Sequence, residues 1–238
     1  MSRIKLGIKV LGLCALVFAF MGIASSGAQA AAQWLVLVGG EVSEGTGGEL
    51  KLETDKTAIL HSKISGVSVL FECPTIATVT AKLGAAGTIA EGGKIKYSGC
   101  TTSLNGSVSK PCEPSNGGTE PGVIVTKPGH AVFVLHELSP TVKDELTKVL
   151  PDVGNTFATI EMSKECSIGT KVPVIGELFL KDCENAFLTH LEKHLVEEGP
   201  LTKLFVISET EEHKASLLGS AWAKVLFNSV FRSYAAHV

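Results

Sequence analysis

The sequence predicts a mainly β protein, an antiparallel β-sandwich or barrel with one or two short helices. Two observations lead to this class. Short runs of β-branched and other apolar residues recur along the chain, and Gly, Pro, Asn and Asp separate them. The 25 glycines among 238 residues suit frequent turns. We expect residues 31–238 to form a single β-rich domain that follows a signal peptide at residues 1–30.

The N-terminal segment has the pattern of a secretory signal. Arg3, Lys5 and Lys9 precede an apolar run over Val10–Ala24, and the segment ends in Ala28-Gln29-Ala30. The run is shorter than the about 20 residues that a membrane-spanning helix needs, so we expect cleavage after Ala30 and no transmembrane anchor in the mature chain. Leu13 before Cys14 also argues against a lipid anchor at that cysteine.

The predicted strands fall into two kinds. Glu49–Glu53 and Lys94–Tyr97 alternate polar and apolar residues, which is typical of a strand with one face in water. Val67–Phe71, Ala131–Leu135 and Leu204–Ile207 are apolar on both faces, which indicates strands covered on both sides.

Further strands follow the same logic. Thr156–Met162 places Ala158, Ile160 and Met162 on one face. Together with five further candidates, these segments give the chain about a dozen strands, the number expected of a sandwich or barrel. The remaining candidates are Trp34–Val38, Ile76–Lys82, Val123–Thr126, Val172–Leu180 and Trp222–Phe227.

Two segments predict helices. Ser139-Pro140 supplies an N-cap residue and a proline for the first turn of a helix over Thr141–Leu150. Asn185–Val196 carries an apolar stripe at helical spacing, although it also fits a strand. Residues 101–122 are rich in Gly, Ser and Pro and predict a long loop.

Five cysteines remain after cleavage, and in an oxidising compartment they form disulfides. Cys100 and Cys112 flank an eleven-residue stretch of the predicted loop, so we expect them to be bridged. Cys166 and Cys183 bracket a strand and form the second expected pair. A Cys73–Cys166 bridge is the alternative, and otherwise Cys73 is unpaired. The odd count leaves one thiol free or joined to another molecule.

The charge balance excludes some partners. The signal holds three of the 21 Lys and Arg and none of the 24 Asp and Glu, so the mature chain carries 18 basic and 24 acidic residues, a net charge of −6. Nucleic-acid binding requires clustered basic residues, so we expect no such partner.

One local motif resembles a metal-binding site. His190 and His194 are four residues apart, as two ligands on one helical face would be. In the zinc-protease motif Glu directly follows the first His, but here Leu191 takes that place and Glu192 comes one position late. A zinc site with Cys166 and Cys183 can be drawn, but exported cysteines more often oxidise. We therefore expect no metal.

Three other patterns are better explained as loops or turns. Ser107–Lys110 matches the Ser-x-x-Lys of acyl-transfer enzymes, but it lies outside any predicted helix. Asn105-Gly106-Ser107 formally matches a glycosylation acceptor, but Asn-Gly is typical of a turn, and we interpret it as a turn. The acidic cluster Glu209, Glu211 and Glu212 beside His213 lacks calcium-loop spacing. No nucleophile elbow, phosphate loop or dinucleotide fingerprint occurs, so we expect no cofactor and assign no catalytic residue.

Short segments along nearly the whole mature chain carry a resemblance to a known group. They are Trp34, Ile64–Gly66, Lys94–Cys100, Gly122–Thr126, Phe157–Cys166, Val174–Glu177 and His213–Lys224. The chain resembles a loosely defined group of secreted β-rich proteins of high-GC Gram-positive bacteria. Cys183 and Asn185–Val196 depart from that pattern. The resemblance implies an exported β-rich domain and no particular activity.

Three functions are compatible with these patterns. The first is a non-enzymatic binding or cell-envelope role outside the cell. The second is a secreted hydrolase of polysaccharide or ester with catalytic acids that the sequence does not locate. The third is a subunit that joins a partner through the odd cysteine.

Overall fold

The computed structural model describes residues 33–139, 142–181, 192–196, 201–232 and 234–237. Within this part the backbone is almost entirely β-strand, and the helical elements are two 3-10 turns, η2 (Ala85–Gly87) and η3 (Lys110–Cys112). The predicted mainly β class is therefore confirmed. The described part contains no helix long and apolar enough to cross a membrane. The signal peptide of residues 1–30 lies outside the described residues and stays a prediction.

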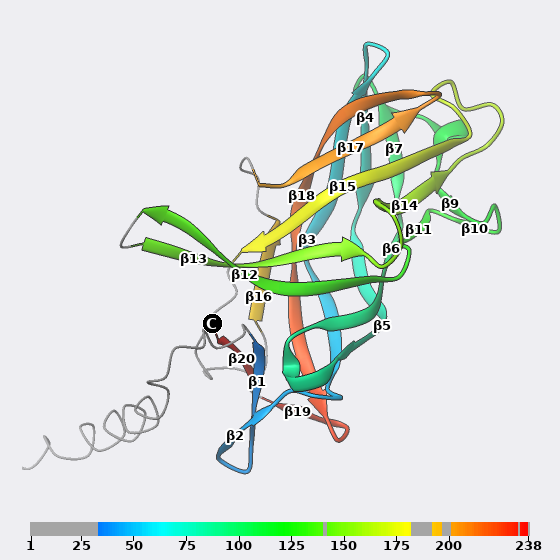
Figure 1. The fold of residues 1–238 in the computed structure, drawn as a ribbon. Helices are drawn as coiled ribbons and strands as arrows, with labels where there is room; N and C mark the ends of the chain where they lie inside the picture. Colours follow the sequence, from blue (N-terminus) through cyan, green and yellow to red (C-terminus); the bar gives the residue numbers. More distant parts are fainter. Residues whose placement is uncertain (1–32, 140–141, 182–191, 197–200, 233, 238) are drawn as a thin grey trace, which may run out of the picture. The chain divides into compact units, whose positions relative to one another are not determined.

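Three strands form a separate small sheet in the order β2–β1–β20. The others pair antiparallel into a closed barrel (Figure 1). The strands of the first half are β1 (Gln33–Val38), β2 (Glu41–Glu44), β3 (Glu49–Ile64), β4 (Val67–Cys73), β5 (Thr75–Leu83), β6 (Ala90–Ser98), β7 (Thr101–Leu104), β8 (Ser107–Val108), β9 (Ser115–Asn116) and β10 (Glu120–Pro121). Those of the second half are β11 (Val123–Val125), β12 (Gly129–Ser139), β13 (Val142–Pro151), β14 (Thr156–Glu161), β15 (Lys171–Lys181), β16 (Glu192–Val196), β17 (Lys203–Ser208), β18 (Glu211–Phe227), β19 (Val230–Arg232) and β20 (Tyr234–His237).

The two longest strands, β3 and β18, run side by side although their paired residues are more than 150 positions apart along the chain (Figure 1). Their register runs from Ala215 opposite Ser62 to Leu226 opposite Glu49 and slips near Gly219. Gly219 has a φ of 142°, and a Cβ there would lie 3.1 Å from the Cα of Ala58. This close approach of two backbones explains why glycine occupies the irregularity.

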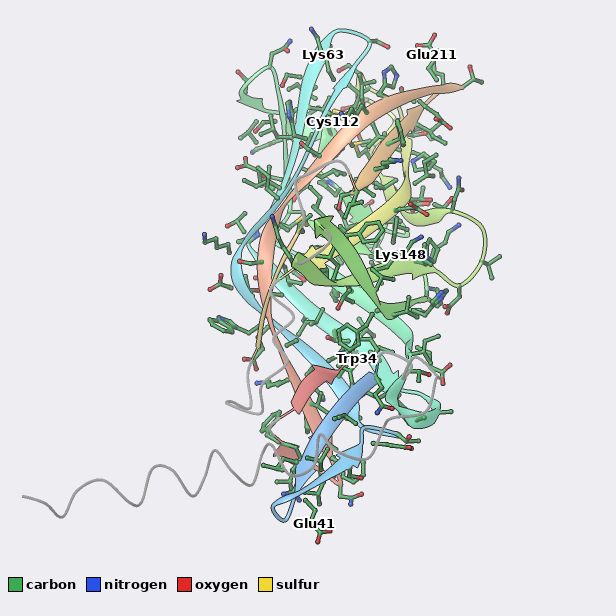
Figure 2. All side chains as sticks on the ribbon, turned by 60° about the vertical axis from the view of Figure 1, so that its left-hand side comes forward. Trp34, Glu41, Lys63, Cys112, Lys148 and Glu211 are labelled. Carbon is green, nitrogen blue, oxygen red and sulfur yellow. A yellow bond between two sulfur atoms is a disulfide. The ribbon has the colours of Figure 1, made fainter. Side chains whose placement is uncertain are left out.

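The buried apolar residues form two clusters. The larger contains Phe71, Ile160 and Val206 together with all four cysteines of the disulfides described below. The smaller surrounds Trp34, whose ring centroid lies 4.0 Å from that of Phe133. In Figure 2, Cys112 lies toward the end that carries Lys63 and Glu211, whereas Trp34 lies toward the end that carries Glu41. Burial on the predicted face of β14 is confirmed, since Ala158, Ile160 and Met162 are buried.

The helix predicted over Thr141–Leu150 is wrong. Val142–Pro151 is strand β13, which pairs with β12 along most of its length and with β15 at Thr147–Val149. The apolar residues Val142, Leu146 and Leu150 are four apart, and a spacing of four is compatible with a period of 2 as well as with a helix. Glu192–Val196, at the end of the second predicted helix, is strand β16, and residues 182–191 lie outside the described part.

The long loop predicted at residues 101–122 is also wrong. This stretch holds strands β7 to β10 and the turn η3. Asn105 and Gly106 have φ values of 49° and 82° and connect β7 to β8, so the turn predicted there is confirmed. Two positive φ values at the central positions are typical of a two-residue hairpin turn.

The cysteine pairing differs from both expected bridges. Cys73 is bonded to Cys100, and Cys112 is bonded to Cys166. The expected Cys100–Cys112 bridge is therefore wrong, as are Cys166–Cys183 and the alternative Cys73–Cys166, and Cys73 is not unpaired. Cys183 lies outside the described residues.

The strand pairing explains the first bridge. β4 pairs antiparallel with β7, with Glu72 opposite Thr101, and one further step along this register brings Cys73 opposite Cys100. The Cys112 carbonyl oxygen accepts a 2.6 Å hydrogen bond from the buried Thr102 hydroxyl, which fixes the turn η3 against β7. The segment after β14 lies against the same region, since the Ser163 hydroxyl donates to the Pro111 carbonyl at 2.8 Å.

Candidate functional site

The feature that stands out in the described residues is an interior cavity of about 190 Å³ that is lined by the barrel strands and open at one edge. Its walls come from strands β3 to β6, β11 to β15, β17 and β18, and Trp34 of β1 also contributes. Buried residues of both apolar clusters, such as Phe71 and Ala223, face it. We call this space the interior cavity.

The interior cavity exists because many inward positions carry small side chains. Six alanines and two glycines line it, including Ala58, Ala131 and Ala158. These residues alternate with Leu, Ile and Val that lie on the same walls. In a wide barrel, short inward side chains do not reach across to the opposite wall. The strands would have to bend inward to bring them into contact, so the centre is left open.

The chemistry of the walls is strongly apolar. The polar residues among those that line the interior cavity are Thr78, Thr126 and Thr147, together with Lys94, Tyr97, Lys127 and His130. No Asp, Glu or Ser is among the described lining residues. Cys73 lines the cavity too, but its sulfur belongs to a disulfide.

Tyr97 is the phenol on the wall of the interior cavity. It sits in β6, opposite Ile76 of β5 and Ile124 of β11, and Ile124 also lines the cavity. Burial raises the pKa of the Tyr97 hydroxyl to about 12, because the charged phenolate would lose its hydration there. Tyr97 therefore offers a neutral hydroxyl to anything in the cavity.

The basic residues gather where β6 changes partner from β11 to β12. β6 pairs with β11 up to Lys96 opposite Val125, and it pairs with β12 from Gly93 opposite Gly129. Between these points the Ile95 amide donates to the Thr126 hydroxyl at 2.8 Å, and the Thr126 amide donates to the Ile95 carbonyl at 3.0 Å. Lys94 and Lys127 are next along this register.

His130 differs from the two lysines because it has an acidic partner. Its Nδ1 lies 2.9 Å from the Asp152 carboxylate. The Asp152 amide also donates to the Pro128 carbonyl at 3.0 Å, which ties the turn after β13 to the start of β12. His130 therefore lies at this edge of the interior cavity with its ring hydrogen-bonded to Asp152.

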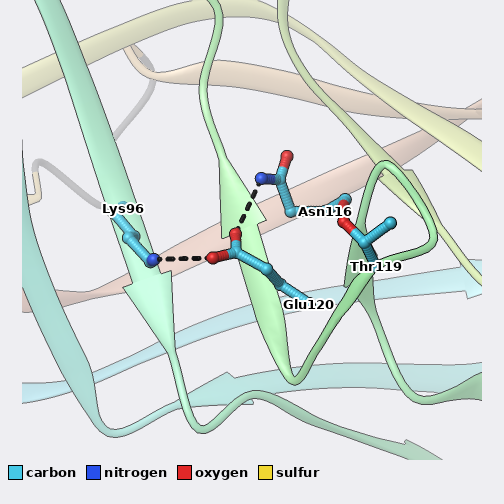
Figure 3. Close-up of polar contacts among 4 residues, drawn as sticks. All are labelled: Lys96, Asn116, Thr119 and Glu120. Atoms are coloured by element: carbon cyan, nitrogen blue, oxygen red, sulfur yellow. Dashed lines mark hydrogen bonds and ion pairs between the residues drawn. The ribbon is translucent and has the colours of Figure 1, made fainter.

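Outside the cavity, the hairpin of β9 and β10 is anchored to β6 by one carboxylate (Figure 3). Asn116 donates from its amide to Glu120 at 2.9 Å, and Lys96 donates to the other carboxylate oxygen at 3.4 Å. The Asn116 hydrogen bond, and after it the positive charge of Lys96, lower the pKa of Glu120. The position is fully exposed, so this contact orients the hairpin and adds little to stability.

The motifs noted in the sequence do not meet at a site. Ser107 and Lys110 are exposed on β8 and η3, and neither lines the interior cavity. Glu209 has a φ of 57° in the turn before β18, and Glu211 and Glu212 are exposed there. His190 lies outside the described residues. Among those described, no three His, Cys, Asp or Glu side chains are grouped to hold a metal.

The cavity residues were not singled out in the sequence. They lie on strands of both predicted kinds, for example Leu52 in Glu49–Glu53 and Phe71 in Val67–Phe71, and no sequence pattern says that the inward face surrounds a space. The alanines at inward positions of several strands are the one signal that points to it. Comparison of the chain with protein-family models, curated proteins and solved structures found no significant match.

Proposed function

We propose that the protein is exported and acts as a non-enzymatic binding domain that holds an apolar small molecule in the interior cavity. The observation that carries this proposal is the cavity volume of about 190 Å³ with its apolar walls. A protein cavity of about 150 Å³ lined by Leu, Ile and Phe already suffices to bind benzene. Small-molecule sites in proteins are mainly apolar concavities with a few polar groups, and this arrangement matches that description.

Energetics support the same function. Each Å³ of empty apolar space in a protein core costs roughly 24 cal/mol, so a dry cavity of this size costs on the order of 4 kcal/mol. A ligand that fills the space restores the missing contacts. The protein is therefore expected to melt at a higher temperature when an apolar ligand is present.

The first experiment measures binding of Nile red, a neutral apolar dye whose fluorescence rises in apolar surroundings. We expect saturable binding to the purified protein and loss of that binding in Ala158→Leu and in Ala131→Leu, which fill the interior cavity. The matched control is Ala215→Leu, because Ala215 belongs to the same buried cluster as Ala158 but does not line the cavity. Unsaturable binding, or equal binding by Ala158→Leu and Ala215→Leu at equal stability, would contradict the proposal.

Export is part of the same proposal. The basic start, apolar run and Ala28-Gln29-Ala30 support it, and the two disulfides are compatible with an oxidising compartment. The intact mass of the secreted protein is expected to correspond to a chain that begins at Ala31. A secreted form that retains Val10–Ala24 would contradict the cleavage.

The hydrolase alternative finds no support in the interior cavity. Sugar hydrolysis requires two carboxyl groups that flank the scissile bond. None of the described residues that line the cavity is Asp or Glu. The geometry therefore favours binding over hydrolysis at this site.

A further inference from the structure

The ionisable side chains around the interior cavity have a one-sided charge. Lys94, Lys127 and His130 are among the described lining residues, and no acid is. The chain as a whole has the opposite balance, with 24 acidic against 21 basic residues. Asp152 is paired with His130 at this edge, so Lys94 and Lys127 are the two basic lining residues without an acidic partner among the described residues.

Extension of the strand register places the two lysines opposite each other. The Ile95–Thr126 hydrogen bonds continue the β6–β11 register by one step, and the next step places Lys94 opposite Lys127. Side chains directly opposite each other on neighbouring strands have Cβ atoms about 4.5–5.5 Å apart. Lys127 is exposed and Lys94 half-exposed, which places the pair at the rim of the interior cavity.

Among the residues that the structure describes, neither lysine has a carboxylate partner. Among the described residues, the ion pairs of this region join Lys96 to Glu120 and His130 to Asp152, and none includes Lys94 or Lys127. Two like charges opposite each other on a sheet repel, and here nothing in the described part compensates them. An anion at the rim would relieve this repulsion and gain two charge-assisted hydrogen bonds.

We propose that the ligand of the interior cavity is a long-chain carboxylate, with its apolar chain inside the barrel and its carboxylate between Lys94 and Lys127. This rests on the proposed function, because the apolar chain occupies the same cavity. The neutral Tyr97 hydroxyl on the wall is compatible with the uncharged part of such a ligand. The structure thus assigns the headgroup to the rim and the hydrocarbon to the interior.

The test compares dodecanoate with 1-dodecanol, which has the same chain without the charge, by displacement of Nile red at low salt. We expect dodecanoate to bind about tenfold more tightly, the gain that two rim ion pairs provide. In Lys94→Gln/Lys127→Gln, dodecanoate affinity is expected to fall to that of dodecanol, while dodecanol affinity stays unchanged. Lys96→Gln is the matched control, since Lys96 lies two residues from Lys94 on β6, pairs with Glu120 and does not line the cavity.

The outcomes separate the two proposals. Equal binding of dodecanoate and dodecanol by the unaltered protein, or a preference that survives in the double variant, would overturn the carboxylate assignment and leave the apolar binding site intact. Loss of the preference in Lys96→Gln to the same degree would overturn it as well. If neither compound nor Nile red binds, the proposed function fails and the assignment fails with it.

Discussion

Tyr97, a half-buried residue on the cavity wall, makes the free energy of unfolding depend on pH. Its pKa is raised from 10.0 to about 12, so the folded protein keeps the proton at pH values where the unfolded chain has lost it. The contribution of the protonated Tyr97 hydroxyl to the free energy of unfolding is fully present below pH 10 and is lost as the pH rises toward 12. We expect the free energy of unfolding to drop over this window by up to about 3 kcal/mol.

Denaturant unfolding at a series of alkaline pH values measures this drop. Lysines also titrate in the same range, so the control is Tyr97→Phe, and the difference between the two proteins isolates the phenol. A Tyr97→Phe protein with the same loss of stability above pH 10 would show that the Tyr97 hydroxyl is hydrated in the folded state.

Gly176 in β15 is a residue at which no side chain fits. Its φ is 127°, and a Cβ would overlap the carbonyl oxygen of Lys203 on the neighbouring strand β17. We expect Gly176→Ala to lower the free energy of unfolding by about 3 kcal/mol or more. Gly154 has a φ of 67° but open space around it, so Gly154→Ala is expected to cost only roughly 1–2 kcal/mol. Equal costs in thermal unfolding would mean that β15 and β17 are not so closely packed.

At the scale of elements, the hairpin of β7 and β8 combines a local turn with a distant contact. Asn105 adopts a positive φ, accepts a 2.9 Å hydrogen bond from the Ser68 amide through its side chain and donates its own amide to the Ser68 carbonyl at 2.8 Å. The side chain therefore links this turn to the β3–β4 turn region.

Replacement of Asn105 tests that link. We expect Asn105→Gly, which keeps the φ but loses the side-chain acceptor, to cost about 1 kcal/mol of unfolding free energy. Asn228 also has a positive φ, 51°, in the turn between β18 and β19. With no side-chain acceptor contact among the described residues to lose, Asn228→Gly is expected to change stability by only a few tenths of a kcal/mol. Chemical denaturation measures the unfolding free energy of the two variants. A loss in Asn105→Gly no larger than the loss in Asn228→Gly would contradict the link.

Strand β13 shows why an element can be mistaken when its neighbours are unknown. Ser139, Pro140 and the spacing of four between apolar residues satisfy the local rules for a helix. The β12–β13 ladder extends from Gly129 opposite Pro151 to Ser139 opposite Val142, and β15 supplies further hydrogen bonds. These long-range pairings outweigh a local preference worth a few tenths of a kcal/mol per residue.

At the scale of the whole molecule, the two disulfides join strands that are distant in sequence. Cys73–Cys100 spans 27 residues and Cys112–Cys166 spans 54. By loop-closure entropy these bridges stabilise the fold by about 3.5 and about 4 kcal/mol. We expect Cys112→Ala/Cys166→Ala to be destabilised at least as much as Cys73→Ala/Cys100→Ala in denaturant unfolding. Peptide mapping without reductant is expected to yield a Cys73–Cys100 and a Cys112–Cys166 peptide, and a Cys100–Cys112 peptide would contradict the strand arrangement.

The sequence by itself determined the fold class, most strand positions and the Asn105-Gly106 turn, because alternation and turn chemistry act over a few residues. Only the tertiary structure decided the rest. Which cysteines meet depends on β4 pairing with β7, and whether residues 142–151 are strand or helix depends on β12 and β15. The interior cavity likewise arises from alanines on strands far apart in the sequence, and the Lys94–Lys127 pair arises from the register of β6 with the segment that follows β11. Each of these features depends on contacts between residues that are far apart along the chain, and no local sequence pattern encodes such contacts.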